Sequence, residues 1–348
     1  MRYLIAIAVA WAAASAEAQD RKLRPWDERP PKCFAPDAPQ SGQCQPPESY
    51  PDAETVSRRV SMLYFNETYP QLERYLSELV DSKKRFPDGV YPEEVIFKSL
   101  VNLMWGSVDN GAGREGNAAW RKAVPESKFV TFADAQLLRQ AAWNARGTGY
   151  ASTVPKEAWE LFAIRLQESE QLLLKLPPAA RESPLWHMAL LAASMDSNRA
   201  QSNPQEIFEA AVKRWPTYAS FYQLVLNRMV PKWGGSWEVV EAFIVRANKM
   251  QPAAEGSSLY ARLYVELNGE CCAGESKFNW SAMKAGFEDI IVRFPDPMYK
   301  NRYASYACMA QDKAAFGQAM SKMKPDQIIP GWWLSGHSYQ SCLRWAGT

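Results

Sequence analysis

Two glycine-containing loops carry the residues best suited to binding chemistry. The first reads Arg146-Gly147-Thr148-Gly149-Tyr150, and its backbone N–H groups together with an arginine fork could hold an anion. The loop follows a predicted helix rather than a strand, and it lacks the lysine–serine pair of a phosphate loop. We therefore favour a structural interpretation, in which Gly147 ends the helix and Arg146 complements the helix dipole.

The second loop is rich in tryptophan. It reads Trp233-Gly234-Gly235-Ser236-Trp237, and both indole rings could stack on a sugar or a peptide. The simpler interpretation is a turn in which Ser236 caps the next helix and the rings pack into the core. The candidate ligand- or partner-binding residues are Arg146, Tyr150, Trp233 and Trp237.

The sequence assigns no catalytic residue, no metal site and no cofactor. Only two histidines occur, His187 and His337, and neither accompanies a G-x-S-x-G nucleophile motif. His187 lies in an apolar helical stretch, which favours a structural role. Two carboxyl groups could still meet in space, because such pairing is invisible in a sequence. We leave catalysis open and favour a non-catalytic protein.

Six cysteines predict disulfide bonds and hence an oxidising compartment. Cys33 and Cys44 are close in the chain and are expected to pair. Adjacent cysteines rarely bond each other, so we expect Cys271 and Cys272 to reach the last two cysteines separately. A four-thiolate zinc site is the alternative, but the chain lacks the C-x2-C spacing of such sites. The disulfide candidates are Cys33, Cys44, Cys271, Cys272, Cys308 and Cys342.

The N-terminus has the pattern of a secretory signal. Arg2 precedes an apolar run at 4–14, and Ala16-Glu17-Ala18 offers a small-x-small cleavage site. The run is shorter than the roughly 20 residues that span a bilayer. We therefore expect cleavage near Ala18 and a soluble, exported protein, periplasmic or secreted, with no transmembrane segment.

Composition favours a globular helical protein that does not bind nucleic acid. Forty basic and 38 acidic residues give a net charge of +2, which is too little to attract a polyanion. Beyond an N-terminal segment rich in proline, which predicts an extended arm, apolar residues recur at helical spacing, and we predict an all-α fold. The expected parts are a signal peptide (1–18), the proline-rich arm (19–52), an N-terminal helical region (53–180) and a tetratricopeptide-like repeat region (181–348).

Local signals mark the helices that carry the first loop. Thr131 and Asp134 have the spacing of a capping box, which predicts the start of the helix that Gly147 ends. Trp159 and Phe162 continue at helical spacing and mark the next helix. The first loop is thus expected to join two helices.

A repeat occupies the second half of the chain. Residues 208–216 (FEAAVKRWP) align with residues 287–295 (FEDIIVRFP), and the offset corresponds to two units of about 34–45 residues, as in helix–turn–helix repeats. Ala211 leaves room for a neighbouring helix, and the final proline ends each copy. We predict a right-handed tetratricopeptide-like solenoid, with helix pairs at about 184–216, 217–252, 256–295 and 298–325.

Four motifs follow one another in a fixed order along the chain. They are 142–151 (AWNARGTGYA), 231–236 (PKWGGS), 279–287 (NWSAMKAGF) and 307–313 (ACMAQDK). Together they resemble an uncharacterised bacterial domain-of-unknown-function family over roughly residues 85–325. The resemblance implies tetratricopeptide-like architecture in an exported or envelope-associated protein, and it implies no activity.

These observations favour an exported, non-catalytic helical repeat protein that binds a protein or peptide partner. Stacked helix pairs form a continuous groove without any reactive residue, as an envelope assembly factor or an inhibitor-type cap requires. The alternative is a helical glycan-active enzyme or a binder of cell-wall glycan, which needs a carboxyl group or a tyrosine in an aromatic cleft. Two carboxyl groups about 5–10 Å apart in a deep pocket would favour the enzyme.

Overall fold

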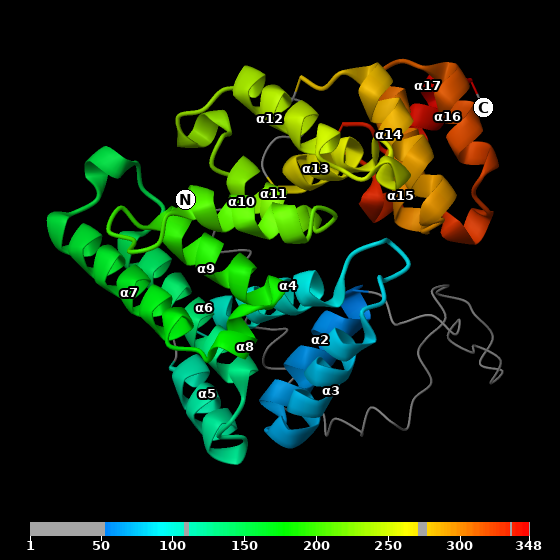
Figure 1. Cartoon of the computed structure of the whole chain (residues 1–348). Helices are drawn as coiled ribbons and strands as arrows, with labels where there is room; N and C mark the ends of the chain where they lie inside the picture. The colour runs from blue at the N-terminus through cyan, green and yellow to red at the C-terminus, as the bar shows by residue number, and fades with distance from the viewer. Residues whose placement is uncertain (1–52, 108–110, 271–276, 335, 348) are drawn as a thin grey trace, which may run out of the picture. The chain divides into compact units, whose positions relative to one another are not determined.

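All regular structure in the described part of the chain is helical (Figure 1). The computed structural model describes residues 53–107, 111–270, 277–334 and 336–347, and over these ranges the predicted all-α class is confirmed. None of the helices in them is both long and apolar enough to cross a membrane. The predicted signal peptide, the proline-rich arm and four of the cysteines (Cys33, Cys44, Cys271 and Cys272) lie outside the described residues.

The helices before residue 175 pack around two of their number, α4 and α6. They are α2 (Ala53–Phe65), α3 (Tyr69–Ser82), α4 (Pro92–Trp105), α5 (Ala112–Ala123), α6 (Lys128–Arg146) and α7 (Lys156–Leu174). Helix α4 contacts α2, α3 and α6, and α6 lies along α7, as Figure 1 shows for the last pair. Trp120 of α5 and Phe132 of α6 are buried in the core that these contacts enclose.

Helix α6 begins earlier than its sequence predicts. Ser127 is the N-cap, and its hydroxyl oxygen accepts a hydrogen bond from the Val130 N–H at 3.1 Å. The predicted capping residue Thr131 therefore lies inside the helix, and Asp134 instead accepts a hydrogen bond from Asn117 at 2.8 Å. The predicted end is confirmed, because Gly147 takes a positive φ of 73° directly after Arg146.

The described residues after 175 form ten α-helices, of which all but the first and the last fall in the predicted pair ranges. They are α8 (Pro178–Arg181), α9 (Pro184–Asp196), α10 (Pro204–Arg214), α11 (Ala219–Leu226), α12 (Trp237–Lys249), α13 (Ser258–Glu270), α14 (Trp280–Arg293), α15 (Pro297–Met309), α16 (Lys313–Ser321) and α17 (Tyr339–Ala346). The pairs α9–α10, α11–α12, α13–α14 and α15–α16 fall at or within a residue of the expected ranges, and the two members of each pair are in contact.

The second helix of each pair begins with the same device. The N-cap side chain of each accepts a backbone N–H from the first turn of its helix, which satisfies a donor that the helix itself leaves unpaired. Ser236 thus caps α12, as the sequence predicts. The four N-caps are Asn203, Ser236, Asn279 and Asp312.

The two aligned phenylalanines have related neighbours. The ring of Phe208 packs against Tyr222 of the following pair at 5.6 Å between centroids, and Phe287 packs against Tyr303 of its following pair at 5.4 Å. They differ in burial, since Phe287 is fully buried and Phe208 only half-buried. Next to Phe287, a Cβ in place of Gly286 would lie 2.8 Å from the Ser257 carbonyl oxygen, so α13 and α14 pack closely there.

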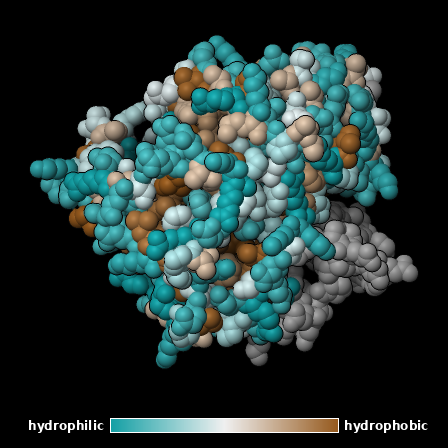
Figure 2. All heavy atoms as spheres, in the orientation of Figure 1, coloured by the Kyte–Doolittle hydropathy of each residue, from teal (hydrophilic) through white to brown (hydrophobic). Residues whose placement is uncertain are grey.

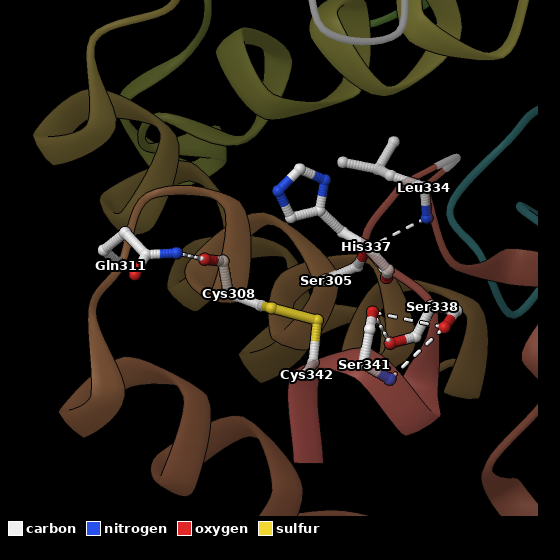
Figure 3. Close-up of a disulfide and its surroundings, with 8 residues drawn as sticks. All are labelled: Ser305, Cys308, Gln311, Leu334, His337, Ser338, Ser341 and Cys342. Atoms are coloured by element: carbon white, nitrogen blue, oxygen red, sulfur yellow. Dashed lines mark hydrogen bonds between the residues drawn. A yellow bond between two sulfur atoms is a disulfide. The ribbon is translucent and has the colours of Figure 1, made fainter. Parts of the chain in front are cut away.

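The disulfide expectation for the last cysteines is wrong. Cys308 of α15 is bonded to Cys342 of α17 (Figure 3), so neither is left for Cys271 or Cys272. A polar face of α15 binds the C-terminal segment and so places the two cysteines near each other. On this face, Asn301 accepts a hydrogen bond from the Trp333 indole at 2.9 Å. Ser305, one turn further on, accepts one from the Leu334 N–H at 2.9 Å. This face brings the two sulfur atoms together.

We expect Phe287→Ala to lower the free energy of unfolding by about 3–5 kcal/mol, because it leaves a cavity in a fully buried site. Urea denaturation of the variant and the wild type measures the change. The control is Phe65→Ala, which removes a ring that is 60% exposed and should cost less than about 0.5 kcal/mol. Equal losses for the two variants would contradict the assignment of Phe287 to the core.

We expect the double variant Cys308→Ser, Cys342→Ser to be less stable by about 2–4 kcal/mol, because the bond closes a chain segment with a sequence separation of 34. Thermal denaturation without reductant compares the variant with the wild type. Limited proteolysis should also cut the variant first between residues 322 and 347. An unchanged melting temperature together with unchanged proteolysis would show that the hydrogen bonds alone hold the segment.

Candidate functional site

Five side chains form a Trp–Arg cluster where the α6–α7 hairpin meets the chain around a short 3₁₀ turn, η3 (Pro231–Trp233). Two of them come from the last turn of α6, one from the first turn of α7, and two from the segment after α11. The members of the Trp–Arg cluster are Trp143, Arg146, Trp159, Arg228 and Trp233.

Within the cluster, each arginine lies against two indole rings. The guanidinium carbon of Arg146 is 5.7 Å from the ring centroid of Trp143 and 5.3 Å from that of Trp159. That of Arg228 is 5.3 Å from Trp143 and 5.4 Å from Trp233. Guanidinium groups at these distances are attracted by the negative face of the ring. Trp143 is therefore the shared centre of the cluster.

A buried carboxylate binds two members of the cluster, Trp143 and Arg228. Asp196 is the last residue of α9, its side chain is fully buried, and its Oδ2 accepts hydrogen bonds from Arg139 Nε at 2.7 Å and from the Trp143 indole at 2.8 Å. Arg228 forms an ion pair with the other oxygen. One carboxylate thus joins α6, α9 and the segment after α11.

The charges around Asp196 do not balance. Two guanidinium groups share one carboxylate, and burial lowers the pKa of both Arg139 and Arg228 to about 10. For Arg228 the nearby charge of Arg139 is the second cause of the lowered pKa, after burial. Both pKa values remain well above neutrality, so the site carries an excess positive charge in surroundings that are poorly solvated.

The outer part of the cluster reaches the surface. The tip of the α6–α7 hairpin has its own small core, in which Trp143 packs on Ala142, Phe162 and Leu166. Trp159 and Trp233 are about two-fifths exposed (37% and 41%). On the face drawn in Figure 2, hydrophobic residues occur in small groups on a mostly hydrophilic surface. The cluster thus presents two part-exposed indole rings beside its arginines.

The structure unites two of the four candidate residues from the sequence. Arg146 and Trp233 both belong to the Trp–Arg cluster, and Arg146 also donates hydrogen bonds to the carbonyl oxygens of Gly147 and Gly149 at 3.0 and 2.9 Å. Its role at the helix end therefore coexists with its ring contacts. Tyr150 is 86% exposed and is not among the ring contacts of the cluster. Trp237, the first residue of α12, is half-buried against the main core.

Sequence reasoning missed the residues that assemble the cluster. Arg139 and Arg228 lie in stretches without any motif, and Asp196 is only the polar end of an apolar helix. Trp143 could have been recognised from the sequence, since it lies in the first motif, three residues before Arg146. A tryptophan and an arginine three residues apart on a helix share a face, and this was the one local signal for the cluster.

The described residues hold no group of three or more histidine, cysteine, aspartate or glutamate side chains arranged to bind a metal ion. His187 lies half-buried on α9, where Nδ1 is 3.0 Å from the Ser183 carbonyl oxygen, and burial lowers its pKa. Comparison of the chain with protein-family models, curated proteins and solved structures yields no match.

We expect Asp196→Ala to destabilise the protein by about 3–5 kcal/mol, because it leaves the guanidinium groups of Arg139 and Arg228 buried without their counter-charge. Urea denaturation at neutral pH measures the loss. The control is Glu160→Ala, which removes an exposed partner of Arg199 and should leave the denaturation midpoint unchanged. If Asp196→Ala proves as mild as the control, water must replace the carboxylate.

Proposed function

We propose that this protein is a non-catalytic helical repeat protein that binds an acidic peptide segment of a protein partner at the Trp–Arg cluster. The observation that carries the proposal is the shared carboxylate: Arg139 and Arg228 both bind Asp196. A second carboxylate, supplied by a partner, would balance the excess charge. Arg146 and Lys232, which lie against the rings of Trp143 and Trp233, add two further cationic side chains at the cluster.

The two arginines of the cluster have more N–H donors than their own contacts use. A guanidinium group has five N–H donors. Arg146 uses Nη1 on the carbonyl oxygens of two loop glycines, and Arg228 uses Nη2 on Asp196, so each has further N–H donors for a partner's carboxylate. Both guanidinium groups lie over indole rings, and the rings of Trp159 and Trp233 are part-exposed. Arginine and tryptophan are also the residues on which binding energy concentrates in protein interfaces.

The arrangement of the C-terminal helices supports a tetratricopeptide-like solenoid. Four successive helix pairs fall near the predicted bounds, their second helices begin with polar N-caps, and Phe208 and Phe287 pack on tyrosines of the next pair. Such stacks bind extended peptides along their surface, although the fold alone does not assign the ligand. The resemblance to the domain-of-unknown-function family points the same way.

Export to the periplasm or the medium is part of the proposal. The signal-like N-terminus, with cleavage near Ala18, predicts it, and the Cys308–Cys342 bond fits a compartment where disulfides persist. An acidic segment of an envelope protein or of a secreted enzyme is then the expected partner. An assembly factor and an inhibitor-type cap both act by such binding.

Selection from a random peptide library displayed on phage tests the proposal, with the purified full chain as the target. We expect the selected peptides to be enriched in aspartate and glutamate next to aromatic residues. Arg146→Gln and Trp233→Ala should each weaken binding of a selected synthetic peptide about tenfold or more, the usual effect of losing an interface anchor. Affinity should also fall as the salt concentration rises.

The matched control is Trp105→Ala, which removes a tryptophan that is exposed on α4 and stands outside the cluster. It should leave peptide binding unchanged. Selected peptides without acidic residues, or binding that survives both cluster variants, would overturn the assignment of this surface.

A further inference from the structure

A half-open surface cavity of about 500 Å³ lies where α4, the start of α9 and the segment between α10 and α11 meet. Its volume is in the range of small-molecule sites, about 300–1,000 Å³. Three aromatic residues, Tyr91, Trp215 and Tyr218, contribute to its wall. None of them belongs to the Trp–Arg cluster, so this cavity is a separate feature of the molecule.

The aromatic wall is held rigidly. The rings of Tyr91 and Tyr218 are stacked, with centroids 3.9 Å apart and planes only 3° from parallel. Arg85 donates a hydrogen bond to the Tyr91 hydroxyl oxygen at 2.7 Å, and that hydroxyl also bonds the Thr217 hydroxyl at 2.8 Å. A wall fixed in this way needs little reordering when a ligand binds.

A buried carboxyl group contributes to the same cavity. Glu93 lies in the first turn of α4, is only 7% exposed, and accepts a hydrogen bond from the Tyr218 hydroxyl at 3.3 Å. Its neighbour Glu94 is different, because it accepts the backbone N–H groups of Tyr91 at 2.9 Å and Ser220 at 2.7 Å. Glu94 therefore holds the fold, while Glu93 retains capacity to bond a ligand.

The charges around the cavity are balanced. Glu93 and Glu182 contribute two acidic groups, and Lys83 and Arg214 contribute two basic ones; Glu182 and Arg214 form an ion pair with each other. Such a lining has no net charge to select a phosphate or an amine. It suits a neutral ligand whose hydroxyl groups both donate and accept hydrogen bonds.

We propose that this cavity binds a neutral sugar of monosaccharide or disaccharide size, with Glu93 as its buried hydrogen-bonding group. The aromatic wall supplies apolar contact for a sugar ring, and the polar rim supplies partners for its hydroxyl groups. The site gives the protein a small-molecule ligand in addition to a peptide partner. It requires no catalytic step.

Glu93→Gln separates ligand binding from folding. Burial, together with the charge of Glu94, raises the pKa of Glu93 above its ordinary value, against the opposing effects of Tyr218 and Lys128. A carboxyl group whose pKa is raised in the folded state costs stability once the pH exceeds its unfolded pKa. Glutamine removes this cost at neutral pH, so the variant should be at least as stable as the wild type.

Saturation-transfer NMR and titration calorimetry on the full chain test the proposal. The probes are glucose, galactose, mannose, N-acetylglucosamine, cellobiose and chitobiose, each at millimolar concentration. We expect at least one to bind the wild type, and Glu93→Gln to weaken it about tenfold or more, because a neutral amide replaces the charged acceptor of a buried hydrogen bond. Tyr218→Phe, which removes the hydroxyl that bonds Glu93, should weaken it less.

The matched control is Glu288→Gln, because Glu288 also accepts a tyrosine hydroxyl, that of Tyr303 at 3.0 Å, but does not line the cavity. It should bind the sugar as the wild type does. The proposal is overturned if no sugar of the panel binds, if binding survives Glu93→Gln, or if inorganic phosphate binds in place of every sugar. Peptide selection at the Trp–Arg cluster is unaffected by any of these outcomes.

Discussion

The carboxylate of Asp196 is the constraint on which the candidate binding surface depends. It accepts hydrogen bonds from Arg139 and Trp143 and pairs with Arg228, so α6 and the segment after α11 both bind the two oxygen atoms of this α9 residue. A buried ion pair stabilises a fold only when its hydrogen bonds are well satisfied. Here that requirement fixes where the α6–α7 hairpin lies against α9, and with it the position of every ring in the Trp–Arg cluster.

Buried hydrogen bonds also link the helices before residue 175 to those after it at a second place. Glu94 of α4 accepts the backbone N–H of Ser220 in α11, and Tyr91 stacks on Tyr218. Arg85 adds an ion pair with Glu255 at 2.9 Å. Buried polar groups carried by one region are thus satisfied by the other. Both the cluster and the sugar-sized cavity lie at such joints, where side chains distant in sequence must meet.

Local sequence signals predict the helices better than the sites. The helical periodicity predicts the all-α class, and the repeat with its final prolines predicts the bounds of the helix pairs, because these signals depend on residues close together in the chain. The predicted start of α6 was wrong because two residues, Ser127 and Thr131, can each cap a helix, and Ser127 is the one that does so. The partners of Trp143 and Trp233 could not be predicted, since Asp196 and Arg228 reach these rings only through tertiary packing.

The covalent link between α15 and α17 has a mechanical consequence. Helix α16 lies between Cys308 and Cys342 in the chain, inside the loop that the bond closes. A pull on the last residues would therefore be carried by sulfur directly to α15, and α16 would stand outside the path of the force. The last helix pair can then hold its place under tension even though α16 itself is short.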